Sequence, residues 1–141
     1  MKAKQPTIES IRAFNRYYTK LLGLLDKDLL KSDYSLVEAR IVYEIHTHGP
    51  LSASQIMSEI DIDKGYLSKV LKQFEKNGLL SKKRSAEDAR ITQLSLTAKG
   101  EVLFHKLNTA SENQISMLVN KLSQEEQRAL VEHMQAIQKL L

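Results

Sequence analysis

The sequence contains no cysteine, which excludes disulfide bonds, thiolate redox sensing and zinc sites built from cysteine. It has only two prolines and five glycines in 141 residues, which predicts long helices with few interruptions. No apolar run approaches the length of a membrane span, and residues 1–6 lack the apolar core of a signal peptide. We therefore expect a cytoplasmic protein with no membrane partner.

Positive charge is concentrated in one short stretch of the chain. Residues 64–84 contain seven lysines and arginines against one acid, Glu75, whereas the whole chain has a formal net charge of only +4. The pI of about 9.2 is weak evidence for nucleic acid binding, since many proteins are mildly basic. The position of the charge is more informative than its total.

The segment after Asp63 has the pattern of an amphipathic helix. Apolar residues at positions 67, 70, 71 and 74 repeat with helical spacing. Asp63 is predicted to cap the helix, and Gly78 to end it as a residue with positive φ. The opposite face carries side chains that can contact phosphates and base edges. These candidates are Lys64, Gly65, Tyr66, Ser68, Lys69 and Lys72. For Tyr66, a half-buried supporting role is an equal alternative.

Two capping boxes precede this helix. Ser35 with Glu38 predicts the start of one helix, and Ser52 with Gln55 predicts the start of a second, short one. The short helix and the Asp63 helix form a helix-turn-helix, whose second member is the candidate for the DNA major groove. Ser52 and Ser54 are candidate phosphate contacts, although capping is the competing role for Ser52.

Residues 79–84 and 91–96 are predicted to form two strands joined by the polar loop 85–90. A hairpin beside a helix-turn-helix is a wing. Lys82, Lys83 and Arg84 lie on its first strand, where we expect contacts with DNA phosphates. A solvated run of charge is the alternative.

The N-terminal segment has two apolar stripes. One repeats at spacings of three and four from Thr7 to about Lys31, and the other runs beside it from Phe14 to Leu24. Two stripes predict a helix that packs on both sides, against its own subunit and a partner. A fully buried helix in a monomer is the alternative.

The C-terminal segment is predicted to be helical. Thr97 caps a long helix that runs to about Leu122, and Ser123 with Glu126 begins a last helix with a late apolar stripe. We therefore divide one compact domain into an N-terminal dimerisation helix (1–34), a winged helix-turn-helix (35–100) and C-terminal dimerisation helices (101–141).

The order of these elements resembles the MarR family of winged-helix transcription regulators. The matching motifs are Tyr34-Ser35-Leu36, Glu38-Ala39-Arg40, Leu67-Ser68, Gly78-Leu79, Asp88-Ala89-Arg90 and Leu94-Ser95-Leu96-Thr97-Ala98-Lys99-Gly100. The Asp-x-Arg motif leading into Leu-Thr-x-x-Gly is the specific part of the match. The resemblance implies a mainly α fold with a small β wing. It also implies a homodimer with interleaved terminal helices that binds a pseudo-palindromic site on double-stranded DNA.

The resemblance implies roles for further residues. Arg90 would enter the DNA minor groove, and Asp88 would hold its side chain by charge-assisted hydrogen bonds. An ordinary exposed ion pair is the alternative. Many family members bind a small aromatic acid between the dimer helices and the winged domain. The corresponding candidates here are Arg16, Tyr18, Tyr34, Arg40 and Tyr43, for which core packing is the alternative.

A narrower resemblance is to the regulator half of MarR–acetyltransferase fusion proteins. It rests on residues 11–19, 63–68 and 111–115. The chain has no Gly-rich pyrophosphate loop, so we expect either a stand-alone relative or the N-terminal part of a fusion.

The sequence predicts no enzyme, cofactor or metal site. It contains no G-x-S-x-G motif and no P-loop, and its four histidines lack metal-binding spacing, so we expect them on the surface. We expect a DNA-binding regulator, most simply a repressor relieved by a small aromatic ligand. The alternatives are the regulator half of a fusion and a winged helix that binds protein. The exposed lysines of the Asp63 helix argue against the last alternative, because a protein-binding helix favours apolar anchors.

Overall fold

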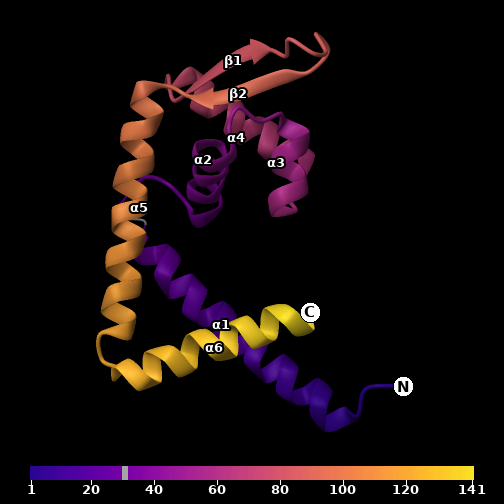
Figure 1. The fold of residues 1–141 in the computed structure, drawn as a ribbon, viewed down its shortest axis with the longest axis vertical. Coiled ribbons are helices and arrows are strands. Elements are labelled where there is room, and N and C mark those ends of the chain that lie inside the picture. Colours follow the sequence, from indigo (N-terminus) through magenta and orange to yellow (C-terminus); the bar gives the residue numbers. More distant parts are fainter. Residues whose placement is uncertain (30–31) are drawn as a thin grey trace. The chain divides into compact units, whose positions relative to one another are not determined.

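The computed structural model describes residues 1–29 and 32–141. In chain order they form α1 (Gln5–Leu29), α2 (Leu36–His48), α3 (Ala53–Ile60), α4 (Lys64–Lys76), β1 (Leu80–Arg84), β2 (Thr92–Leu96), α5 (Ala98–Val119) and α6 (Gln124–Leu140) (Figure 1). The predicted fold class, mainly α with a small β wing, is confirmed. The chain divides into two compact units, Met1–Asn108 and Thr109–Leu141, which are described separately. No helix in the described ranges combines the length and apolar character needed to cross a membrane.

The helix starts follow the local sequence closely. In each predicted capping box, the serine hydroxyl accepts a hydrogen bond from the backbone N–H of the residue three positions later. The side chain of that later residue accepts a hydrogen bond from the serine N–H in return. The three boxes are Ser35–Glu38, Ser52–Gln55 and Ser123–Glu126. Asp63 caps α4 in a similar way, since its carboxylate accepts from the Tyr66 N–H at 2.9 Å. Each cap satisfies donors that a helix start otherwise leaves unpaired.

Several element ends differ from the predictions by a few residues. α1 begins at Gln5 rather than Thr7, and its predicted end near Lys31 lies outside the described residues. α5 ends at Val119 rather than about Leu122, because a tight turn joins these residues before Ser123 caps α6. The strands begin one residue later than predicted, at Leu80 and Thr92.

The end of α4 explains the late start of β1. Gly78 has the predicted positive φ, +73°, and the next residue, Leu79, donates its N–H to the carbonyl of Phe74 at 2.9 Å. This hydrogen bond closes the helix by a left-handed C-terminal turn, so Leu79 belongs to the turn rather than the strand.

The core of the Met1–Asn108 unit lies among α2, α3, α4, the hairpin and the first turns of α5. The predicted apolar stripe of α4 is buried, and the Phe74 side chain is only 1% exposed. Other fully buried core residues include Ile41, Ile56 and Leu79. Because these side chains come from every surrounding element, the core fixes the side of α4 that faces solvent.

A single residue before α3 pairs with the hairpin as an isolated β-bridge. β1 and β2 pair antiparallel, from Leu80 opposite Leu96 to Arg84 opposite Thr92 (Figure 1). Leu51, which precedes α3, exchanges both backbone hydrogen bonds with Leu94 of β2, at 2.7 and 3.0 Å. This bridge was not predicted, and it connects the base of the wing to the start of α3.

Gly100 lies where the backbone of α5 approaches that of Leu79. A Cβ at this position would overlap the Leu79 carbonyl oxygen. We expect Gly100→Ala to lower the free energy of unfolding by about 1–3 kcal/mol, the usual range for overpacking. Thermal and denaturant unfolding would measure it, with Gly23→Ala as the matched control because a Cβ there meets no atom within 4 Å. A Gly100→Ala protein as stable as the control would show that α5 can shift freely.

The Thr109–Leu141 unit contains the end of α5, a turn and α6. The amide of Gln127 donates to the carbonyls of Val119 and Leu122, at 3.2 and 3.1 Å, and so fixes the turn. None of the residues of α6, all of which are described, is buried. Apolar side chains with more than a third of their surface exposed include Ile115, Leu118, Val131, Met134 and Ile137.

Candidate nucleic-acid interface

The solvent side of α4 is polar and basic. All six residues predicted to contact DNA on this helix are exposed: Lys64, Gly65, Tyr66, Ser68, Lys69 and Lys72. Tyr66 is 42% exposed, which favours a surface role over support of the core. A shallow groove of about 390 Å³ runs along this side, lined by Gly65, Ser68, Lys69, Lys72, Gln73 and Lys76. The helix thus presents several hydrogen-bond donors and positive charges on one continuous surface.

A second groove, of about 250 Å³, lies where α3, α4 and the hairpin meet. Its lining residues are Ala53, Ser68, Leu71, Lys72, Lys82, Thr92 and Leu94. It brings the start of α3, the middle of α4 and the wing strands together at one concave surface. Thr92 was not among the predicted site residues. Its pairing opposite Arg84 is the strand register that could have indicated it.

The wing tip holds Arg90 in a fixed arrangement. The Asp88 carboxylate accepts hydrogen bonds from Arg90 Nε and Nη2, each at 3.1 Å, and from the Arg90 backbone N–H at 3.0 Å. The Arg90 side chain is nevertheless 91% exposed, so the guanidinium remains available to a ligand. The predicted bond between these two residues is present.

The electrostatics of this pair favour the ionised carboxylate. Hydrogen bonds from the Arg90 side chain and then from its backbone hold the pKa of Asp88 below its ordinary value. A lowered pKa means that Asp88 loses its charge only at acidic pH. The arrangement of Arg90 is therefore independent of pH throughout the neutral range.

An ion pair connects the wing to α4. Lys82 Nζ of β1 lies 2.7 Å from a carboxylate oxygen of Glu75, and both side chains are partly exposed. Glu75 is the single acid in the basic stretch, and its partner was not predicted because the two residues lie on different elements. Lys83 and Arg84, the other predicted wing contacts, are exposed on β1.

The two serines at the start of α3 differ in their surroundings. The hydroxyl oxygen of Ser52 accepts from the Gln55 N–H at 3.2 Å, so the capping role considered for it is present. Ser54 is exposed in the first turn of α3. Ser54 is the more accessible of the two to a phosphate.

The five candidates for an effector pocket contact different neighbours. The ring contacts are Tyr18 with Phe14, Tyr34 with Phe74, and Tyr43 with Phe104, at centroid distances of 5.6, 6.2 and 6.4 Å. Arg40 lies 6.0 Å from the centre of the Tyr43 ring, whereas Arg16 is exposed on α1. Among these contacts, only that of Arg40 with Tyr43 joins two of the five candidates.

The four histidines were predicted to lie on the surface, but two of them have specific side-chain partners. His46 Nδ1 lies 2.7 Å from Glu101, and the ring stacks on Phe104 at 3.7 Å. His48 Nδ1 lies 2.9 Å from Glu44, whose side chain is buried and also accepts from Arg40 Nε at 2.7 Å. In the described ranges no three histidine or acidic side chains are grouped in a way that could hold a metal ion.

Glu44 was missed by the sequence analysis. It is only 1% exposed, and both of its partners are four residues away on α2. The spacing of Arg40, Glu44 and His48 could have indicated the ion pairs. It could not have indicated the burial.

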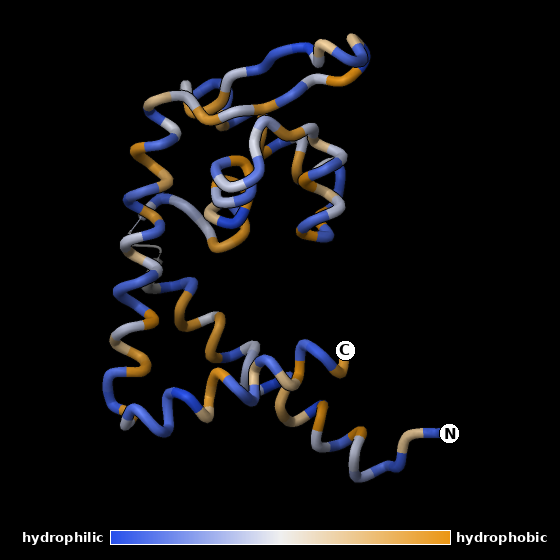
Figure 2. The backbone as a smooth tube through the Cα atoms, viewed as in Figure 1, coloured by the Kyte–Doolittle hydropathy of each residue, from blue (hydrophilic) through white to orange (hydrophobic). Residues whose placement is uncertain are grey.

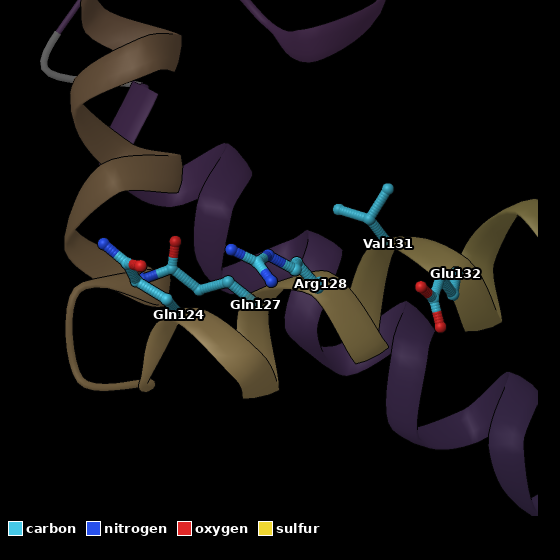
Figure 3. Close-up of a pocket in the computed structure, with 5 residues that line it drawn as sticks. All are labelled: Gln124, Gln127, Arg128, Val131 and Glu132. Atoms are coloured by element: carbon cyan, nitrogen blue, oxygen red, sulfur yellow. The ribbon is translucent and has the colours of Figure 1, made fainter.

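A further hollow lies elsewhere and has no evident ligand. About 610 Å³ in volume, it is lined by Gln124, Gln127, Arg128, Val131 and Glu132 (Figure 3). All five residues belong to α6. A single helix face cannot enclose a small molecule, so we assign no binding site to it.

Comparisons with known proteins agree with this geometry. Residues 34–92 match the model of the MarR family. The HTH-type transcriptional regulator MgrA of Staphylococcus aureus is 28% identical over 119 residues, which cover 84% of this chain and 76% of that protein. The uncharacterized HTH-type transcriptional regulator YdgJ of Bacillus subtilis is 30% identical over 82 residues, which cover 58% of this chain and about half (50%) of that protein.

A solved structure has the same fold over nearly the whole chain. Streptococcus pneumoniae FabT, solved in complex with DNA, superposes with a TM-score of 0.77 at 19% identity. The match covers 95% of this chain and 96% of FabT. At this identity the likeness establishes the fold alone.

Proposed function

Since the chain belongs to the MarR family of DNA-binding transcription regulators, we propose that it is a homodimeric repressor that binds a pseudo-palindromic operator. The observation that carries this proposal is the basic surface formed by α4 and the hairpin. Two lysines from these elements, Lys72 and Lys82, line one groove together with the start of α3. A surface of this kind suits the phosphate backbone on either side of a DNA groove.

In this proposal α4 enters the major groove. Base edges are contacted mainly by the N-terminal residues of a recognition helix, which gives this role to Lys64, Tyr66, Ser68 and Lys69. Gly65 allows close approach, since it has no side chain between the helix and the groove. Lys72, farther along, is assigned to phosphate, with Ser52 and Ser54 contacting phosphate from the start of α3.

The wing contacts the neighbouring minor groove. Arg90 is exposed at the hairpin tip and oriented by Asp88, which supports insertion of its guanidinium into a narrow A/T-rich groove. Lys82, Lys83 and Arg84 are assigned to phosphates along β1. Base contacts then come from α4, and the wing adds a preference for groove width.

Dimerisation is assigned to the terminal segments, 1–34 and 101–141. α1 leaves Ile11, Phe14, Tyr17 and Leu24 exposed, and apolar stretches recur along α1 and α6 (Figure 2). Exposure of so many apolar side chains to water is unfavourable, which supports a partner that covers them. A second copy of the chain would place two α4 helices on half-sites about one helical turn apart.

Relief of repression by a small aromatic ligand is the remaining part of the proposal. Its candidate residues are Arg16, Tyr18, Tyr34, Arg40 and Tyr43. In the structure the tyrosines pack on separate aromatic rings, so a ligand would have to displace at least one such contact. The effector therefore stays a prediction from the family resemblance.

Selection from randomised DNA duplexes at near-physiological salt tests the proposal. We expect enrichment of a pseudo-palindrome, with retention that persists against excess unrelated DNA. Retention that salt abolishes and that enriches no sequence would mean that the basic surface binds DNA non-specifically. The alternative of a winged helix used for protein contact would then be favoured.

Lys82→Ala tests the assignment of the wing strand to phosphates. We expect the affinity for selected and unrelated DNA to fall by a similar factor, with the slope of log K against log salt reduced by about one per lysine. Titrations at several salt concentrations measure it. Glu75→Gln is the matched control, because it frees Lys82 from its 2.7 Å ion pair and should leave DNA affinity equal or higher. An unchanged salt slope in Lys82→Ala would contradict the assignment.

A further inference from the structure

The start of α5 is hydrogen-bonded to the end of α4. Lys99 donates from Nζ to the carbonyl of Asn77 at 2.8 Å. Thr97 donates from its hydroxyl to the carbonyl of Gly78 at 2.6 Å and from its backbone N–H to the carbonyl of Leu79 at 3.0 Å. Three successive carbonyls after α4 therefore accept hydrogen bonds from one turn of α5.

The carbonyl of Asn77, the C-cap residue of α4, is one of the groups that a helix leaves unsatisfied at its C-terminus, whereas Gly78 and Leu79 lie beyond the helix end. The Asn77 carbonyl carries part of the negative charge of the helix dipole, so an ammonium group is a favourable donor to it. Lys99 is also exposed and lies next to the basic DNA-binding region. Its 2.8 Å contact with Asn77 nevertheless directs its charge to the protein backbone.

The same part of α5 is fixed on α2. Glu101 lies 2.7 Å from His46 near the end of α2, and Phe104 stacks on the His46 ring. The first two turns of α5 therefore hold the ends of both α2 and α4. The Thr97 and Lys99 hydrogen bonds hold the end of α4 on this frame, in addition to the packing of its buried side chains in the core.

We propose that Lys99 is a positioning residue for DNA recognition, which sets the angle at which α4 meets the major groove. The proposal rests on the proposed role of α4 in DNA binding. A helix of 13 residues is about 20 Å long, so a tilt of about 10° moves one end by about 3 Å. Base contacts tolerate displacements of only about 0.5 Å, so a small loss of restraint at the Asn77 end weakens sequence-specific contacts.

Lys99→Met tests the proposal, because methionine keeps much of the side-chain length and removes the donor. We expect the affinity for the selected duplex to fall about 10-fold, with the affinity for unrelated DNA and the salt slope unchanged. Amide hydrogen exchange at Gly78 and Leu79 should become faster. Lys99→Arg keeps a charged donor. It should therefore retain most of the affinity for the selected duplex, and amide exchange at Gly78 and Leu79 should stay close to the wild-type rate. Lys106→Met, also exposed on α5, is the matched control for loss of one charge.

Two outcomes in the Lys99→Met variant would overturn the proposal. Unchanged specific affinity would show that the hydrogen bond to Asn77 does not affect recognition. An equal loss for selected and unrelated DNA, with a salt slope lower by about one, would show that Lys99 contacts phosphate directly. Absence of sequence preference in the wild-type protein would overturn the proposed function, and the recognition role of Lys99 with it. The exchange measurement would then still report whether the contact holds α4.

Discussion

Replacing Arg90 with alanine should lower the affinity for the selected DNA site at least about 30-fold while the oligomeric state stays unchanged. A well-placed arginine contact in a DNA groove contributes about 1–3 kcal/mol, and a dimer loses two of them. The Arg90 side chain is 91% exposed and contacts Asp88 alone among the interactions described, so its removal should not disturb folding. Fluorescence anisotropy with the selected duplex measures the effect.

Two variants on the same hairpin separate the roles of charge and position. Arg84→Ala removes an equal charge from β1. It should lower the affinity for selected and for unrelated DNA by a similar factor, which is smaller than the loss in Arg90→Ala. Asp88→Asn keeps Arg90 but weakens the hydrogen bonds that orient it, and should produce part of the Arg90→Ala loss. An Arg90→Ala protein with wild-type affinity would show that the wing tip does not enter the groove.

Ile11→Glu should convert the proposed dimer to a monomer and reduce binding to the full operator at least about 100-fold. The side chain is 54% exposed on α1, so a glutamate is harmless in one subunit but would be buried without a partner at a dimer interface. A monomer loses the second half-site and with it the gain in avidity from two linked contacts. Sedimentation velocity and anisotropy on the same samples measure the two effects.

The control for this substitution lies on the same helix. Lys20→Glu also introduces a glutamate on α1, at an exposed position that already carries a charge, and should leave the dimer intact. A stable Ile11→Glu dimer would contradict the assignment of this α1 surface to the interface. A wild-type monomer that binds the full operator with high affinity would contradict dimeric recognition itself.

Local signals in the sequence were sufficient for most of the fold. The capping boxes, the apolar stripe of α4 and the positive φ at Gly78 each depend on residues within a few positions of one another. Helix starts and the solvent side of α4 could therefore be predicted. The hydrogen bonds of Asp88 with Arg90 also join neighbouring residues, and the family resemblance implied them.

Contacts between distant residues were not predictable by the same means. The bridge of Leu51 to Leu94 and the ion pair of Glu75 with Lys82 join elements whose approach depends on the whole core. Lys99 was recognised only as part of a motif, because its partner carbonyl lies 22 residues away. A sequence pattern shows which side chains can donate, but the acceptor depends on tertiary packing.

The placement of α4 and the wing on DNA can be measured directly because the chain has no cysteine. Gln73→Cys on α4 and Ala86→Cys at the wing tip, each coupled to a DNA-cleaving iron chelate, would mark the DNA nearest to each position. We predict two clusters of cuts for each probe, related by the dyad of the operator. The α4 clusters should lie about one helical turn apart, with the wing clusters in the flanking minor grooves. Uniform cutting along the bound duplex, or no cutting from the α4 probe, would contradict the proposal that α4 and the wing bind DNA.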